Sequence, residues 1–201
     1  MTVLDFIVLG VICFFIGFLV KYVDFIEDEL KGSKRALLFK KISPFMGLAY
    51  GVLILLVIIV FPVLIPLAIG VILGEIVAKK IDAPGHLIAI TAFVLVGVGL
   101  VFFGSLSLYT GVLIWSTTMF VALSVLFLLA SLSDEFVDKY AENKKLPKIV
   151  STGLSFRPVL EITAFIVSLV FSQWFIWVTI FSFDLAYVSF TKILPKIFSK
   201  K

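Results

Sequence analysis

The chain has few charged residues, one cysteine and one histidine, and these scarcities exclude several classes of protein. Only 15% of its 201 residues are Asp, Glu, Lys or Arg, whereas 62% are hydrophobic, and the mean hydropathy is +1.23. Soluble domains are about 45–50% apolar and about 25% charged, so this composition excludes an ordinary soluble domain. The single Cys13 lies within an apolar run, which rules out an intrachain disulfide and speaks against a structural zinc site.

The motifs of ordinary soluble enzymes are also absent. The sequence contains no Gly-rich phosphate loop, H-E-x-x-H, G-x-S-x-G or C-x-x-C motif. The net charge of +4 does not indicate nucleic-acid binding, because Lys and Arg in a membrane protein mainly record its topology. We therefore expect the lipid bilayer as a partner and no nucleic acid.

Apolar runs of the length that a bilayer requires are abundant. A membrane-spanning helix needs about 20 mainly apolar residues. We predict seven such helices. Six lie near 3–20, 44–60, 62–78, 86–103, 110–131 and 158–173, and the seventh follows them and ends near 194. The first run lacks the basic start and the cleavage site of a signal peptide, so we expect it to be retained. The run 44–78 is divided at Pro62 and Pro66 because proline interrupts helical hydrogen bonding; one tilted helix is the alternative.

The positions of the basic residues support this division into seven spans. All 17 Lys and Arg residues fall within 21–41, 79–80, 139–157 and 192–201, which seven spans place on one side of the membrane. Basic residues accumulate on the cytoplasmic side. The sequence thus predicts an all-α, polytopic transmembrane helix bundle in the cell membrane. It forms a single integral membrane domain over residues 1–201, with the N-terminus outside and the C-terminus inside.

Asp184 is the strongest indication of a function inside the membrane. It lies near the midpoint of the predicted seventh span, where an isolated carboxylate costs about 2.5–3.5 kcal/mol. Thr117 and Thr118 offer hydroxyls at similar depth, and Glu75 lies about one turn inside the interface. These four residues predict a pathway for a cation or a proton-coupled solute. The alternative is a protonated Asp184 that hydrogen-bonds to a neighbouring helix.

Two acidic D-x-x-x-D pairs suggest a different chemistry. Asp24 and Asp28 follow the first span, and Asp134 and Asp138 follow the fifth. Two carboxylate pairs on one side of a bundle provide ligands for Mg²⁺ bound to substrate phosphates. The arrangement resembles the UbiA-type membrane prenyltransferases, which carry two Asp-rich motifs separated by four spans, although the Asn-Asp that opens that family's first motif is missing. The resemblance implies an Mg²⁺-dependent enzyme acting on a prenyl diphosphate or lipid phosphate. The alternative is a set of solvated charges.

Three basic groups near the same surface are candidates for binding a phosphate or lipid headgroup: Arg157, Lys79 and His86. Each also has a structural explanation. Arg157 lies four residues before Glu161, Lys79 lies four residues after Glu75, and His86 opens a helix where it can serve as a hydrogen-bonding group.

Three functions therefore remain open: a small transporter or channel for a cation or proton-coupled solute, a membrane enzyme, and a scaffold that binds a partner. Small residues at Gly47 and Gly51, and again at Gly70 and Gly74, predict close helix packing within the fold or in a homo-oligomer.

Overall fold

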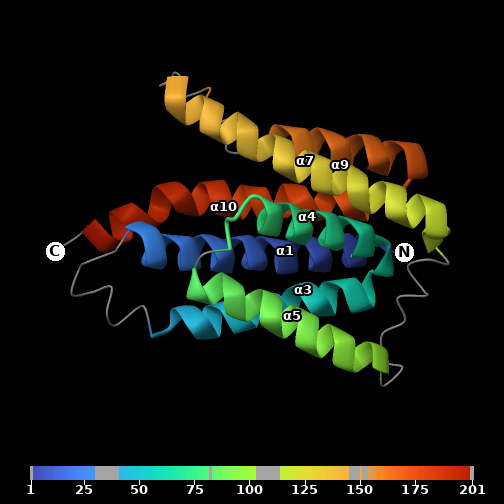
Figure 1. The fold of residues 1–201 in the computed structure, drawn as a ribbon, viewed down its shortest axis with the longest axis horizontal. Helices are drawn as coiled ribbons and strands as arrows, with labels where there is room; N and C mark the ends of the chain where they lie inside the picture. The colour runs from blue at the N-terminus through green and yellow to red at the C-terminus, as the bar shows by residue number, and fades with distance from the viewer. Residues whose placement is uncertain are drawn as a thin grey trace.

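The computed structural model describes residues 2–29, 41–81, 83–102, 114–144, 150, 154 and 156–199. Within these ranges the chain forms α-helices and no strand (Figure 1). The helices are α1 (Val3–Asp24), α3 (Ser43–Val60), α4 (Ile65–Val77), α5 (Pro84–Phe102), α7 (Thr117–Lys144), α9 (Pro158–Phe171) and α10 (Phe175–Ser199). A π-helical turn, η1 (Phe25–Glu29), extends α1, and a 3₁₀ turn, η2 (Pro62–Leu64), precedes α4.

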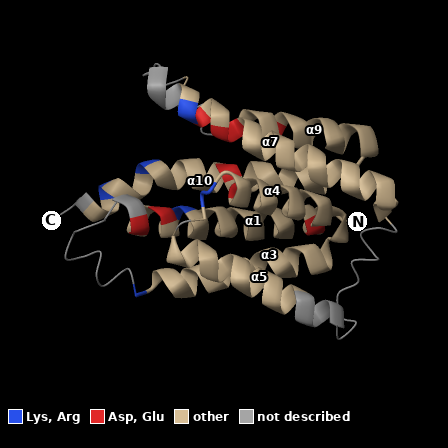
Figure 2. Cartoon of the chain, viewed as in Figure 1, with Lys and Arg blue, Asp and Glu red and all other residues tan. Residues whose placement is uncertain are grey.

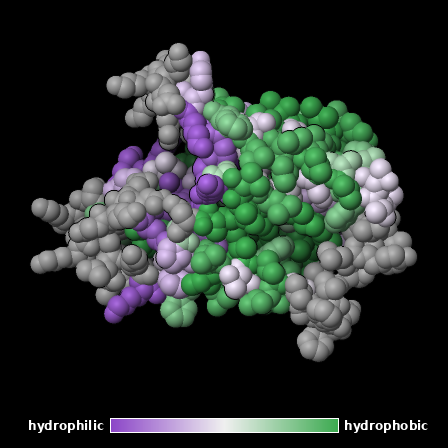
Figure 3. Space-filling model, viewed as in Figure 1, coloured by the Kyte–Doolittle hydropathy of each residue, from purple (hydrophilic) through white to green (hydrophobic). Residues whose placement is uncertain are grey.

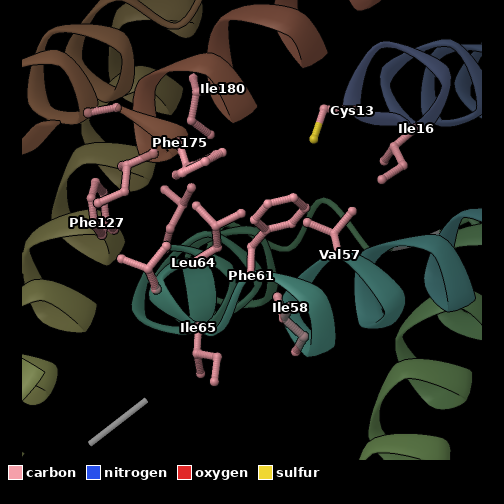
Figure 4. Packing of buried hydrophobic residues seen from close by; sticks show 14 of the residues in the cluster. Cys13, Ile16, Val57, Ile58, Phe61, Leu64, Ile65, Phe127, Phe175 and Ile180 are labelled. Atoms are coloured by element: carbon pink, nitrogen blue, oxygen red, sulfur yellow. The ribbon is translucent and has the colours of Figure 1, made fainter. Parts of the chain in front are cut away.

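The helices lie side by side and alternate in direction, so the two ends of the chain lie at opposite ends of the bundle (Figure 1). Helix α1 is central and packs against α10 and α3. Helix α5 packs against α3, α7 packs against α4, and α9 rests on both α7 and α10. Buried side chains from α1, η2, α7 and α10 meet in the interior (Figure 4).

The length and composition of the helices are compatible with a membrane-embedded protein. In the described part of the chain, four segments are long and apolar enough to cross a membrane: Val3–Glu27, Ser43–Val60, Thr117–Tyr140 and Phe175–Phe198. Three shorter apolar helices accompany them, at Pro62–Val77, Pro84–Gly97 and Pro158–Phe171. Hydrophobic residues cover much of the exterior in view (Figure 3). Phe45 and Leu95, for example, are about two-thirds exposed or more.

The predicted division of 44–78 into two helices is confirmed. Helix α3 ends at Val60, and Phe61 leaves the helical conformation with φ −122° and ψ 74°. Pro62 then starts η2, and Pro66 lies in the first turn of α4. Both prolines therefore occupy positions where their missing N–H removes no helical hydrogen bond.

Both predicted ends of the fifth helix differ from the structure. Helix α7 does not begin near 110 and end near 131: Ser116 has a left-handed φ of 60°, so the helix begins at Thr117, and it continues to Lys144. Asp134 and Asp138, predicted to follow the fifth span, therefore lie within α7, since polar side chains allow a helix to continue beyond its apolar part. The segment between the predicted fourth and fifth spans, 104–109, lies outside the described residues.

Glycines permit the closest helix contacts, as the small-residue spacing predicts. A Cβ atom on Gly47 would overlap the backbone carbonyl of Gly85, and one on Gly51 would overlap that of Ala89, so α3 and α5 touch backbone to backbone. On α4, Gly70 likewise lies against the backbone of α7 at Ser124. These contacts bring the ends of α3, α4, α5 and α7 close enough to share a polar site.

We expect Gly47→Ala to lower the free energy of unfolding by about 1–3 kcal/mol, because the added methyl must push α3 away from α5. The matched control is Gly97→Ala on α5, whose Cβ would meet Leu55 at an ordinary 3.7 Å. Thermal unfolding in detergent measures both variants. Equal melting temperatures for the two would contradict the packing described here.

Candidate functional site

Charged residues gather at one end of the bundle, where α1 and α10 end and α5 begins (Figure 2). A cavity of about 230 Å³ opens there between α1, α3, α4, α5, α7 and α10. We call it the charged cavity. Its polar lining consists of Asp24, Tyr50, Glu75, Lys80, His86, Glu135, Asp138, Arg157 and Tyr187.

A second, apolar cavity of about 110 Å³ adjoins the charged one. Its lining includes Cys13 on α1, Leu64 in η2 and Ile180 on α10, which appear together in Figure 4. Five residues line both cavities: Ile54, Val71, Ile72, Arg157 and Phe183. The two cavities therefore meet at these five residues; the charged groups line the first, and the second is almost entirely apolar.

A chain of hydrogen bonds crosses the charged cavity from α3 to α10. The Tyr50 hydroxyl lies 2.5 Å from Nδ1 of His86, and Nε2 of His86 lies 2.6 Å from Oδ1 of Asp24. The Tyr187 hydroxyl donates to the other Asp24 oxygen at 2.6 Å. Four helices are thus joined by one polar network.

Arg157 pairs with Asp184 across the interior. Its Nε donates to Oδ1 of Asp184 at 2.8 Å, and its NH2 group bonds the same oxygen. Burial lowers the pKa of Arg157, but the charge and hydrogen bonds of Asp184 outweigh this effect, so the pKa is raised and the guanidinium stays charged. Asp184 is 1% exposed.

This ion pair changes the interpretation of Asp184. The carboxylate is not an isolated mid-membrane charge, because Arg157, which precedes α9 with a left-handed φ of 46°, reaches it from another segment. The alternative that Arg157 pairs with Glu161 is not seen, since its guanidinium bonds Asp184 instead. Glu75 also lies near, with Oε1 4.0 Å from NH1 of Arg157.

Lys80, rather than the predicted Lys79, reaches the cavity. Helix α4 ends at Val77, so the helical spacing between Glu75 and Lys79 does not apply. Lys79 is exposed and takes a left-handed φ of 58°, which turns the chain. Nζ of Lys80 lies 2.6 Å from Oε1 of Glu135. Burial lowers the pKa of Lys80, but the hydrogen bond and charge of Glu135 dominate, so this pKa is raised.

The structure gives separate positions to the four aspartates proposed as Mg²⁺ ligands, and Asp134 hydrogen-bonds to the backbone of α9. Both carboxylate oxygens of Asp134 accept backbone N–H groups, from Val159 at 2.9 Å and from Leu160 at 2.8 Å. Asp134 therefore caps the first turn of α9, where these donors have no helical acceptor. Asp138 lines the charged cavity, and the Asp28 side chain lies outside the described residues.

These surroundings do not fit a magnesium site. Asp24 already uses both oxygens, for His86 and Tyr187. Within the parts of the chain that the structure describes, no three residues of the metal-binding types gather around one point. We therefore derive no chemistry from a metal here.

Two of the four predicted pathway residues, Asp184 and Glu75, lie near the same Arg157 guanidinium, but the two threonines lie apart from them. Thr117 and Thr118 lie in the first turn of α7, are exposed, and line neither cavity, whereas Asp184 is buried. Sequence reasoning also missed Tyr50, Lys80 and Glu135. Tyr50 carried one usable signal, because a polar aromatic residue within an apolar span requires a hydrogen-bond partner when buried.

Comparisons with protein-family models, with curated proteins and with solved structures find no match to this chain. The geometry of the two cavities is therefore the basis for assigning a function.

We expect Asp184→Asn to cost about 3–5 kcal/mol of unfolding free energy, because it leaves the Arg157 guanidinium buried without its counter-charge. The double variant Arg157→Gln, Asp184→Asn removes both charges and should recover part of this loss. Thermal unfolding of the two variants in detergent is the test. An Asp184→Asn protein as stable as the wild type would show that the ion pair is unimportant.

We expect Asp134→Ala to destabilise the protein by about 1–2 kcal/mol, because two N–H groups of α9 lose their acceptor. The loss should be the same in Mg²⁺ and in EDTA. Asp138→Ala, which changes the other member of the same D-x-x-x-D pair, is the matched control and should cost less. If Mg²⁺ stabilised the wild type but not the Asp134→Ala variant, a metal-binding role for Asp134 would be restored.

Proposed function

We propose that this is a multi-pass protein of the cell membrane, with all seven helices crossing the bilayer and the charged end facing the cytoplasm. The alternating helix directions support this topology (Figure 1). So does the position of the described Lys and Arg residues, which lie toward one end of the bundle (Figure 2). Basic residues on the cytoplasmic side are the general rule for membrane helices.

We infer further that the protein binds a lipid-like amphiphile, with its polar headgroup in the charged cavity and part of its hydrocarbon chain in the apolar cavity. The observation that carries this proposal is that the two cavities adjoin, with five residues lining both. Ligand sites are mostly apolar and contain a few convergent polar groups that fix the orientation of the ligand. Here the charged cavity places polar groups beside apolar side chains, and the adjoining cavity is almost entirely apolar, which matches an amphiphile better than a small ion.

The charged cavity offers complementary groups for such a headgroup. A phosphate would meet the guanidinium of Arg157 and the ammonium group of Lys80, since charge-assisted hydrogen bonds to phosphate are strong. A hydroxyl or amine on the same headgroup would meet Glu75. This carboxylate lies 4.0 Å from Arg157, farther away than a hydrogen bond.

Transport of a cation or proton through Asp184 is the second candidate. One observation favours it: Oδ2 of Asp184 is buried and has no hydrogen-bond partner among the described residues. However, the cavity that adjoins the charged one is lined almost entirely by apolar side chains, which provide no polar path deeper into the bundle. We therefore favour amphiphile binding.

Ala68→Phe tests this proposal, because Ala68 lines the apolar cavity and a phenyl group would fill space that the chain needs. We expect the phospholipid retained by the variant to fall about tenfold or more below the wild-type amount. A tenfold loss of affinity corresponds to only about 1.4 kcal/mol of binding free energy. Native mass spectrometry after delipidation, with phosphatidic acid and phosphatidylglycerol added back, measures retention.

The matched control is Ala122→Phe, which makes the identical change at an exposed position on α7 that lines neither cavity. This variant should bind lipid like the wild type. Equal lipid retention by both variants would exclude the apolar cavity as the chain site.

A further inference from the structure

The hydrogen-bond network in the charged cavity ends in a tyrosine on each side, and the two tyrosines have different partners. Tyr50 contacts the imidazole of His86, whereas Tyr187 contacts the carboxylate of Asp24. Asp24 accepts from both His86 and Tyr187, so both its oxygens are engaged. An ionised carboxylate has no proton to give, so Nε2 of His86 must carry the proton it shares with Asp24. In a neutral imidazole Nδ1 is then the acceptor, and Tyr50 is its donor.

The two tyrosines of the network consequently differ in reactivity. Tyr187 donates to a carboxylate, whose negative charge opposes ionisation of the phenol. Tyr50 donates to an imidazole that can take up its proton, and the resulting imidazolium would be held by Asp24. This is the order of groups in an acid–base triad, with a phenol in the place of the usual serine or cysteine.

Tyr50 is also the member of the triad that can meet a ligand. Both nitrogens of His86 are engaged, whereas the Tyr50 oxygen keeps an acceptor position and the side chain lines the charged cavity. The side chains of His86 and Asp24 remain 12% and 21% exposed beside a cavity of about 230 Å³.

We propose that Tyr50, His86 and Asp24 form a proton relay in which Tyr50 is the general base for a hydroxyl group on the bound headgroup. This inference rests on the proposed amphiphile site, because that ligand supplies the hydroxyl. In the step, the ligand O–H bond breaks and its proton goes to the Tyr50 oxygen, while the phenolic proton moves to Nδ1 of His86. The products are a ligand alkoxide and an imidazolium paired with Asp24, so one proton has passed from ligand to protein.

Covalent labelling with phenylmethylsulfonyl fluoride tests the relay without knowledge of the natural ligand. An activated phenol attacks sulfur, forming an O–S bond and breaking the S–F bond, so fluoride leaves and the phenolic proton passes to His86. Mass spectrometry of peptides from the full-length protein in detergent compares Tyr50 with Tyr140, which is 60% exposed and serves as the internal reference. We expect Tyr50 to react faster although it is only 6% exposed.

Variants of the relay make the test specific. His86→Gln and Asp24→Asn should each slow labelling of Tyr50, by roughly 100-fold where the base is removed, and leave Tyr140 unchanged. Tyr22→Phe is the matched control: it removes a hydroxyl from α1 at a residue that lines neither cavity, so Tyr50 should react as fast as in the wild type. The unchanged Tyr140 rate and the circular dichroism spectrum check that each variant is folded.

Two results would overturn the relay: a wild-type protein in which Tyr50 reacts no faster than Tyr140, or folded His86→Gln and Asp24→Asn variants whose Tyr50 reacts as fast as that of the wild type. If a variant fails to fold, the wild-type ratio of the two tyrosines decides alone. Protection of Tyr50 by phosphatidylglycerol would link the relay to the amphiphile site. If labelling of Tyr50 is fast and depends on His86 but no phospholipid slows it, the lipid ligand is contradicted and the activation of Tyr50 by His86 is still supported.

Discussion

A charge that leaves water for an apolar interior must find an opposite charge or a hydrogen-bond partner, and this constraint organises the bundle. The partners come from different helices. Arg157, ahead of α9, meets Asp184 on α10; Lys80, after α4, meets Glu135 on α7; and His86 on α5 meets Asp24 on α1. Each pair ties together segments that are distant in sequence. The charged cavity exists because these pairs converge at one end of the bundle.

Features set by local sequence were predictable. Proline at 62 and 66 divides two helices because its effect on the backbone is local, and the gathering of basic residues at one end follows from the order of apolar runs. The length of α7 was not predictable in this way. Its apolar part ends near Ser131, but the helix continues through polar residues to Lys144. The ion pair between Glu135 and Lys80 is a tertiary contact that holds this polar part in place.

The partners in the site could not be read from the sequence, because each depends on distant segments. Asp184 suggested an isolated carboxylate, yet its counter-ion lies 27 residues earlier in the chain. Asp24 and Tyr187 are separated by 163 positions and still share a hydrogen bond. Asp134 resembled a metal ligand by its spacing to Asp138, whereas its oxygens cap α9. Spacing identifies which residues share a helical face, but not what lies opposite that face.

The two cavities suggest how an amphiphile would be held. Its chain would lie among side chains that gain by excluding water, at about 25 cal/mol per Å² of buried apolar surface. The headgroup would meet groups already fixed by ion pairs and hydrogen bonds, so little ordering is needed on binding. Such fixed surroundings are also what proton transfer requires, because a relay works only when donor and acceptor are already aligned. Binding and chemistry would then depend on the same paired charges.

The most direct test of this account is a high-resolution structure of the protein extracted with its native lipids, by cryo-electron microscopy in a nanodisc. The account predicts elongated density in the apolar cavity that continues into the charged cavity, with its polar end within hydrogen-bond distance of Arg157 or Tyr50. Lipid density confined to the outer surface, with only water in the charged cavity and side chains filling the apolar one, would contradict it.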